Sequence, residues 1–288
     1  MKKGLFWLIV AIFLSSCIKK AILRVDLSDK SLSQQEKSVP NVTVWVHGTK
    51  LFTGKIFPTF FFSEPGLLHV SEYENKNHLR KVGNWLNEHS PKEFPFEHFY
   101  QFGWSGDLSV SARESAAKRL SNELSELVEK YRKLHNCDPY LTVITHSHGG
   151  NVALNLDKFK KNYKINRLIL LACPVQKETK HLIKSDLFEE IYSLYSTLDG
   201  IQVLDPQGFQ YKIKDQNDKK APLFSQREFD AASNLKQGRV KLSGRGIAHV
   251  EFILPHFLKY LSRLIYELNS STEQNVILSL WKNKKSMK

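Results

Sequence analysis

A seven-residue stretch, Thr145-His146-Ser147-His148-Gly149-Gly150-Asn151, constrains this chain more than any other feature. It follows an apolar run with β propensity at 141–144 and precedes a helical pattern that begins at Val152. A serine on a sharp turn from a strand into a helix has a strained backbone, which pushes its hydroxyl out above the sheet. The two glycines keep Cβ atoms away where the turn and a substrate come close. The stretch therefore predicts a strand, a turn and a helix, with Ser147 as a nucleophile.

One position departs from the usual pattern Gly-x-Ser-x-Gly, because the first glycine is replaced by Thr145. This position faces the incoming helix and favours a small residue. A second interpretation is therefore open, in which the stretch only caps a buried helix and does no chemistry. The order of strand, turn and helix favours the nucleophile.

The N-terminal residues 1–17 have the layout of a secretory signal, with a basic start, an apolar core at 4–14 and Leu14-Ser15-Ser16-Cys17 at the end. The core is shorter than the roughly 20 residues that a membrane-spanning helix needs. The ending resembles a bacterial lipobox, in which the cysteine is lipidated, and several acyl chains at one terminus give stable anchoring. We expect lipidation of Cys17 and anchoring in the bacterial cell envelope. Ile18 favours the outer membrane over the inner one, and an ordinary signal peptide or uncleaved anchor is the alternative.

The rest of the chain divides by composition. Residues 18–40 are polar and predict a tether, 41–270 suffice for one large α/β domain, and 271–288 predict a basic C-terminal tail. Loss of Lys2 and Lys3 with the signal lowers the formal charge from +13 to +11. A basic exported protein favours anionic surfaces such as acidic lipid headgroups. Nucleic acid is not an expected partner, since no recognition motif is present.

Alternating β-type and helical patterns predict the fold class. The expected strands are 41–46, 97–102, 141–144, 165–172, 191–196 and 239–242, and the expected helices are 74–89, 107–135 and 254–268. Ser111 and Glu114 form an expected capping box at the start of the long helix. The alternation implies an α/β fold with a mostly parallel central sheet and helices on both faces. Ligands bind at the carboxyl ends of the strands in such sheets.

A serine nucleophile needs a base beside it and an acid that orients the base. Asp199 is the expected acid, because it stands in a tight turn that leaves the strand at 191–196, and Asp205 is its rival. His249 is the expected base, because it follows the last predicted strand in the glycine-rich loop 244–250, and His256 is its rival.

The oxyanion of an acyl transfer needs preorganised N–H donors. The backbone N–H groups of His148 and Thr49 are the expected donors, since Thr49 follows the first strand of the domain within His47-Gly48-Thr49. His146 and His148 diverge on a tight turn and have no clustered third ligand, so we expect no metal and no other cofactor.

The motifs together resemble the lipase and esterase side of the α/β-hydrolase superfamily, in particular the branch of triacylglycerol lipases and GPI inositol-deacylase-like proteins. They are Val46-His47-Gly48-Thr49, Phe102-Gly103-Trp104-Ser105-Gly106, Arg113 in the long helix, and the 145–151 stretch. The resemblance covers roughly residues 41–265 and implies the α/β-hydrolase fold, a Ser147–Asp199–His249 triad, and hydrolysis of carboxylic esters, lipids among them. Two alternatives stay open: a non-catalytic binding lipoprotein with the same fold, and an acyltransferase that uses the same triad.

Three further features each have more than one interpretation. The aromatic run at 57–62 either walls an acyl pocket or covers the site as a mobile flap, or else it packs in the core, and the polar segment 201–236 is a cap or a long loop. Cys137 and Cys173 form a disulfide or remain free, buried thiols, and their places at opposite ends of strands favour free thiols.

Overall fold

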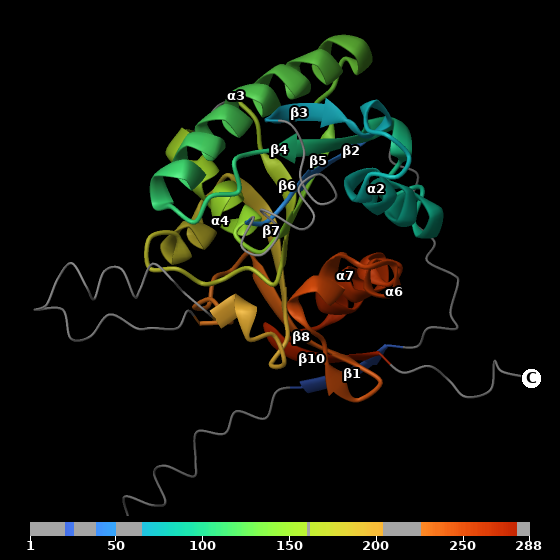
Figure 1. Ribbon diagram of the computed structural model, residues 1–288, viewed down its shortest axis with the longest axis vertical. Helices are drawn as coiled ribbons and strands as arrows, with labels where there is room; N and C mark the ends of the chain where they lie inside the picture. The colour runs from blue at the N-terminus through green and yellow to red at the C-terminus, as the bar shows by residue number, and fades with distance from the viewer. Residues whose placement is uncertain (1–20, 26–38, 50–64, 160–161, 204–225, 281–288) are drawn as a thin grey trace, which may run out of the picture.

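The computed structural model (Figure 1) describes residues 21–25, 39–49, 65–159, 162–203 and 226–280. The strands are β1 (Ala21–Val25), β2 (Asn41–Val46), β3 (Gly66–His69), β4 (Phe99–Gly103), β5 (Tyr140–His146), β6 (Ile165–Leu171), β7 (Phe188–Tyr195), β8 (Leu235–Leu242), β9 (Arg245–Gly246) and β10 (Asn275–Leu280). The α-helices are α2 (His78–His89), α3 (Val110–His135), α4 (Gly149–Leu154), α6 (Pro255–Leu258) and α7 (Leu261–Ser270). Cys17, Asp205 and the aromatic run at 57–62 lie outside the described residues.

The strands form one sheet in the order β1-β10-β8-β7-β6-β5-β2-β4-β3, and β9 pairs with β8. β3 runs antiparallel to β4, β9 runs antiparallel to β8, and the other pairs are parallel. β2 and β5 are neighbours, and their register places Val46 opposite Thr145. The carboxyl ends of these two strands therefore lie side by side, as the two predicted site motifs require. The predicted α/β fold with a mostly parallel central sheet is confirmed.

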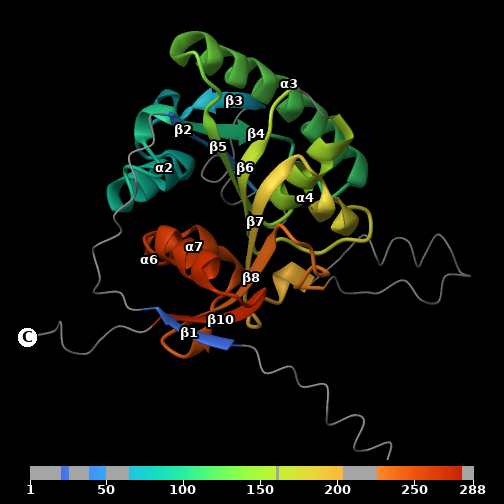
Figure 2. The same ribbon diagram turned by 180° about the vertical axis from the view of Figure 1, so that it is seen from behind.

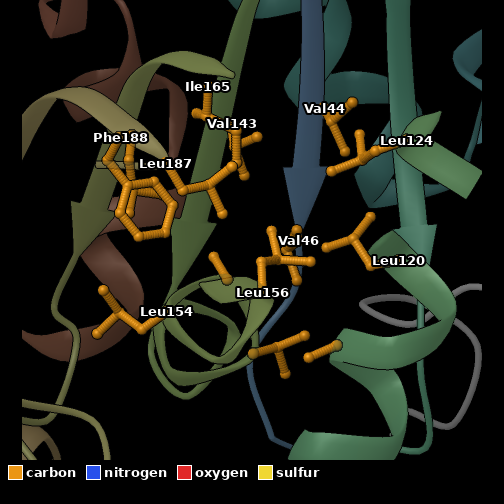
Figure 3. Packing of buried hydrophobic residues seen from close by; sticks show 14 of the residues in the cluster. Val44, Val46, Leu120, Leu124, Val143, Leu154, Leu156, Ile165, Leu187 and Phe188 are labelled. Atoms are coloured by element: carbon orange, nitrogen blue, oxygen red, sulfur yellow. The ribbon is translucent and has the colours of Figure 1, made fainter. Parts of the chain in front are cut away.

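Helices cover both faces of this sheet (Figures 1 and 2), with α3 and α4 on one side and α2, α6 and α7 on the other. Side chains alternate along β2, so Val44 and Val46 join one apolar cluster while Trp45 joins the other. Figure 3 shows Val44 and Val46 packed against Leu120 and Leu124 of α3. Burial on both faces explains why these strands are almost wholly apolar.

Two strands lie where the sequence predicts polar ends. β1 falls inside the expected tether 18–40, and β10 falls inside the expected basic tail 271–288. They pair in parallel from Ala21 opposite Val276 to Val25 opposite Leu280. The predicted tether and tail are wrong for these residues, because each strand is a short apolar run within a segment whose overall composition is polar. β1 pairs only with β10 among the described strands, and β10 lies between β1 and β8.

Helix starts also differ from the prediction. Ser109, and not a capping box of Ser111 and Glu114, caps α3: its Oγ accepts the Ala112 N–H at 3.0 Å. The Glu114 carboxylate instead contacts Lys158. None of the helices within the described ranges is long and apolar enough to cross a membrane.

Candidate active site

Ser147 occupies the turn between β5 and α4 with a positive φ of 54°. A left-handed backbone is unfavourable for a residue with a side chain, so the surrounding contacts must hold it in place. The Ser147 N–H donates to the Leu171 carbonyl at 2.9 Å. Glycines make the approach of the neighbouring chain possible: a Cβ at Gly48 would lie 2.8 Å from Cβ of Ser147, and one at Gly149 would lie 2.5 Å from the Val46 carbonyl oxygen. The predicted sharp turn is therefore present.

Thr145, the residue that departs from the usual pattern, is fully buried in β5. Its hydroxyl donates to the Ile169 carbonyl of β6 at 3.2 Å. The polar atom is thus satisfied within the sheet, and the turn that follows still takes its left-handed conformation at Ser147. A threonine at this position is compatible with the elbow geometry.

The expected acid and base meet at the carboxyl ends of the strands. The Asp199 side chain, in the loop after β7, accepts a hydrogen bond from His249 Nδ1 at 2.7 Å. His249 begins the 3₁₀ turn His249–Ile253 that follows the β8–β9 hairpin. The rival base His256 instead contacts the Glu251 carboxylate at 3.3 Å. The structure therefore brings Asp199 and His249 together.

Gln202 and Arg227, which the sequence does not predict as site residues, hold the loop after β7 that carries Asp199, here called the acid loop. The Gln202 N–H donates to Asp199 Oδ1 at 3.0 Å, and its side-chain amide donates to the Cys173 carbonyl at 2.9 Å. Arg227 donates to the carbonyls of Ser196 at 3.0 Å and Asp199 at 2.9 Å. The three side-chain bonds end on backbone carbonyls about thirty positions away in the chain. Because every residue has a carbonyl, the sequence holds no signal for such pairs.

A second network holds the loop that carries His249. Arg245 and Glu251 form an ion pair at 2.8 Å, and the Ala248 N–H donates to the same carboxylate at 2.6 Å. The hydrogen bond from Arg245 lowers the pKa of Glu251 to about 2. The Ile247 N–H donates to Ser196 Oγ at 2.9 Å, which joins this loop to the start of the acid loop.

The loop after β2 is fixed by His47 and Trp104. The Trp104 N–H donates to His47 Nε2 at 3.2 Å, so Nδ1 carries the hydrogen and donates to the Gly48 carbonyl at 2.7 Å. In a trans peptide the carbonyl and the following N–H point in opposite directions. The Thr49 N–H, an expected oxyanion donor, is therefore directed away from the His47 ring.

The two histidines beside Ser147 have separate surroundings. His146 Nε2 donates to the His249 carbonyl at 3.1 Å, whereas His148 Nδ1 lies 3.4 Å from the Asn151 amide nitrogen. Burial, followed by the nearby charge of Arg113, lowers the pKa of His148 to about 3, so its ring is neutral. Within the described ranges, no group of three histidine, cysteine or carboxylate side chains is placed to hold a metal ion.

Both remaining cysteines are free thiols, as predicted. Cys173 is buried under the turn at Ser147, where a Cβ at Gly150 would lie 2.4 Å from its Sγ, and burial raises its thiol pKa. Cys137 is half-buried and not fully buried as expected. The buried thiol acts as packing for the turn.

No protein-family model matches the sequence, and no curated protein matches it. Several solved structures resemble the fold. Esterase PE8 has 12% identity and a TM-score of 0.42 over 80% of this chain and 94% of its own. A hyperthermophilic esterase from the archaeon Pyrobaculum calidifontis has 13% identity and a TM-score of 0.36 over 85% of this chain and 68% of its own. Phospholipase PlaB from Legionella pneumophila has 12% identity and a TM-score of 0.38 over 79% of this chain and 61% of its own. Similarity at this level assigns no reaction to the chain.

Proposed function

We propose that this protein is a serine hydrolase that cleaves carboxylic esters. Ser147 Oγ attacks the acyl carbon, His249 takes the hydroxyl proton and returns it to the leaving alcohol, and water then releases the acid by the same steps reversed. Asp199 stabilises the imidazolium, and the N–H groups of His148 and Thr49 stabilise the oxyanion. The observation that carries the proposal is the 2.7 Å bond between Asp199 and His249, held at the strand ends beside the strained Ser147 turn.

Exposed apolar side chains support an ester with a lipophilic group. Leu198, Ile201 and Val250 have exposed fractions of 57, 36 and 47%. Leu198 and Ile201 flank Asp199, and Val250 follows His249. Apolar surface beside a reacting centre favours substrates with an acyl or alcohol chain that covers it. We therefore propose lipid esters, or esters of comparable apolar character, as the substrates.

Reaction with a fluorophosphonate probe tests the nucleophile directly. We expect the folded protein to be labelled at Ser147, and S147A to remain unlabelled. S121A is the matched control, because Ser121 is also buried but bonds to the Phe159 carbonyl in another part of the fold. Absence of labelling in the folded unsubstituted protein would reject the proposal. Hydrolysis of p-nitrophenyl esters of increasing acyl length then measures the preference for apolar chains.

We also propose that the protein is anchored to the bacterial cell envelope through lipid on Cys17. β1 begins at Ala21, four residues after this cysteine. Four extended residues span at most about 14 Å, so a lipid on Cys17 would hold the β1 edge of the sheet close to the bilayer. C17S should move the protein from the membrane to the soluble fraction, whereas the control C137S should not. Continued membrane association of C17S would count against anchoring at this residue.

A further inference from the structure

His146 contacts several parts of the candidate site at once. It directly precedes Ser147, and its Nε2–H donates to the backbone carbonyl of His249 at 3.1 Å. The two imidazole rings are also in contact, with centroids 4.6 Å apart and planes tilted by 50°. On its other side, Nδ1 would lie 3.3 Å from a Cβ placed at Gly48, in the loop that carries the Thr49 N–H. His146 is thus enclosed by the nucleophile turn, the base and the oxyanion loop.

The protonation of this ring follows from its contacts. A carbonyl oxygen only accepts hydrogen bonds, so Nε2 of His146 carries the hydrogen. Burial, followed by the charge of nearby His249, holds the pKa of His146 well below its usual value, and His78 and His47 act in the same direction. Nδ1 is therefore unprotonated and the ring is neutral. A neutral neighbour adds no positive charge beside His249 when His249 accepts the serine proton.

We propose that His146 is a positioning residue that holds the base against the nucleophile. This rests on the function proposed above. The bond from Asp199 fixes only the Nδ1 side of the His249 ring, whereas the bond from His146 fixes the His249 backbone. It links the base to the residue next to Ser147, although the two histidines are 103 positions apart. A reacting group displaced by about 1 Å loses about 10²-fold in rate.

Three substitutions of His146 test separately what its hydrogen bond and its ring contribute. H146Q keeps a side-chain N–H donor of similar reach, H146M has a similar length without a donor, and H146F keeps a ring without a donor. We expect the rate of fluorophosphonate labelling at Ser147 to fall about 10²-fold in H146M and H146F. H146Q should stay close to the unsubstituted rate. In ester hydrolysis, kcat should fall while KM changes little, because the interaction orients the base and does not bind substrate.

Labelling stoichiometry distinguishes positioning from folding. A merely structural loss lowers the fraction of chains that ever react, whereas a positioning loss lowers the rate and leaves one label per chain at long times. H98F is the matched control, because His98, in the 3₁₀ turn Phe96–His98 before β4, hydrogen-bonds to Tyr131 of α3 at 2.8 Å, and it should change only the melting temperature.

H146M and H146F labelled at the unsubstituted rate, or H146Q and H146M slowed equally, would overturn the positioning role. If H146F does not fold, the comparison of H146Q with H146M decides alone. No labelling of the unsubstituted protein would reject the proposed function instead.

Discussion

Asp199 Oδ2 lies 2.7 Å from His249 Nδ1, although the two residues are 50 positions apart in the chain. The Asp199 side chain has no exposed surface, and that of His249 is 11% exposed. A carboxylate only accepts hydrogen bonds when ionised, so the pair fixes hydrogen on Nδ1 and leaves Nε2 as the proton acceptor. This is the tautomer that a base for a serine hydroxyl requires.

D199N should abolish most of the proposed esterase activity while the fold is retained. An asparagine amide can donate to Nδ1, which favours the wrong tautomer of His249, and this change costs about 10⁴-fold in kcat in a serine triad. The measurement is kcat with a p-nitrophenyl ester, compared with D107N at an exposed aspartate. Activity of D199N within a few fold of that of D107N would assign the acid to another residue.

G48A should impair the site through steric contact. The added Cβ would lie 2.8 Å from Cβ of Ser147, closer than real Cβ atoms approach, and 3.2 Å from the His146 carbonyl oxygen, so the Ser147 turn or the oxyanion loop must shift. We expect a loss of about 10²-fold in kcat. G200A, next to Asp199, is the control, because its Cβ would have no atom within 4 Å. Equal activity of the two variants would show that the loop absorbs the methyl group.

The sequence predicts the central part of the fold well, because each buried parallel strand is an apolar run that periodicity detects. β2, β5 and β6 were found in this way, and the turn at Ser147 follows from its local residues. β1 and β10 are not predicted, because each is a short apolar run between polar segments and the sequence does not show that the two runs pair. β3 was missed as well, since it has only four residues at the edge of the sheet.

The supporting contacts of the site were less predictable than its chemical groups. Asp199 and His249 could be selected because only certain side chains do acid–base chemistry and because they follow strands. Arg227 and Gln202 act on backbone carbonyls and N–H groups, which every residue provides. The role of Trp104 depends in the same way on a contact 57 positions away, at His47.

R227A should loosen the acid loop. Arg227 donates to the carbonyls of Ser196 and Asp199, and R227A leaves them without this charged partner. We expect the loss to lower the free energy of unfolding by about 1–3 kcal/mol. We expect a lower kcat together with this loss of stability, and little recovery in R227K because lysine lacks the planar fork. Denaturant unfolding and ester kinetics measure both effects, with R119A at an exposed helix position as the control. Full activity of R227K would attribute the effect to charge alone.

Thr145 should stabilise the sheet without limiting the reaction. T145V removes the hydroxyl that donates to the Ile169 carbonyl, and we expect a cost of about 1 kcal/mol in unfolding. T145G restores the common pattern but leaves a cavity and a flexible strand residue, so it should cost more than T145V. Neither variant should raise kcat. A large gain of activity in T145G would instead show that the threonine distorts the elbow.

Acid should destabilise the protein through its buried neutral histidines. Burial lowers the pKa of His148 to about 3 and that of His78 to about 4, whereas an unfolded histidine titrates near 6.5. Below pH 6.5 the unfolded chain therefore binds more protons than the folded one, so the free energy of unfolding falls as pH falls toward these values. Each such histidine contributes about 1.4 kcal/mol per pH unit within this range. H148Q should reduce the difference in unfolding free energy between pH 7 and pH 4.5, measured with urea at both values. An unchanged difference in H148Q would mean that His148 is already protonated in the folded protein or that the folded chain relaxes around its charge.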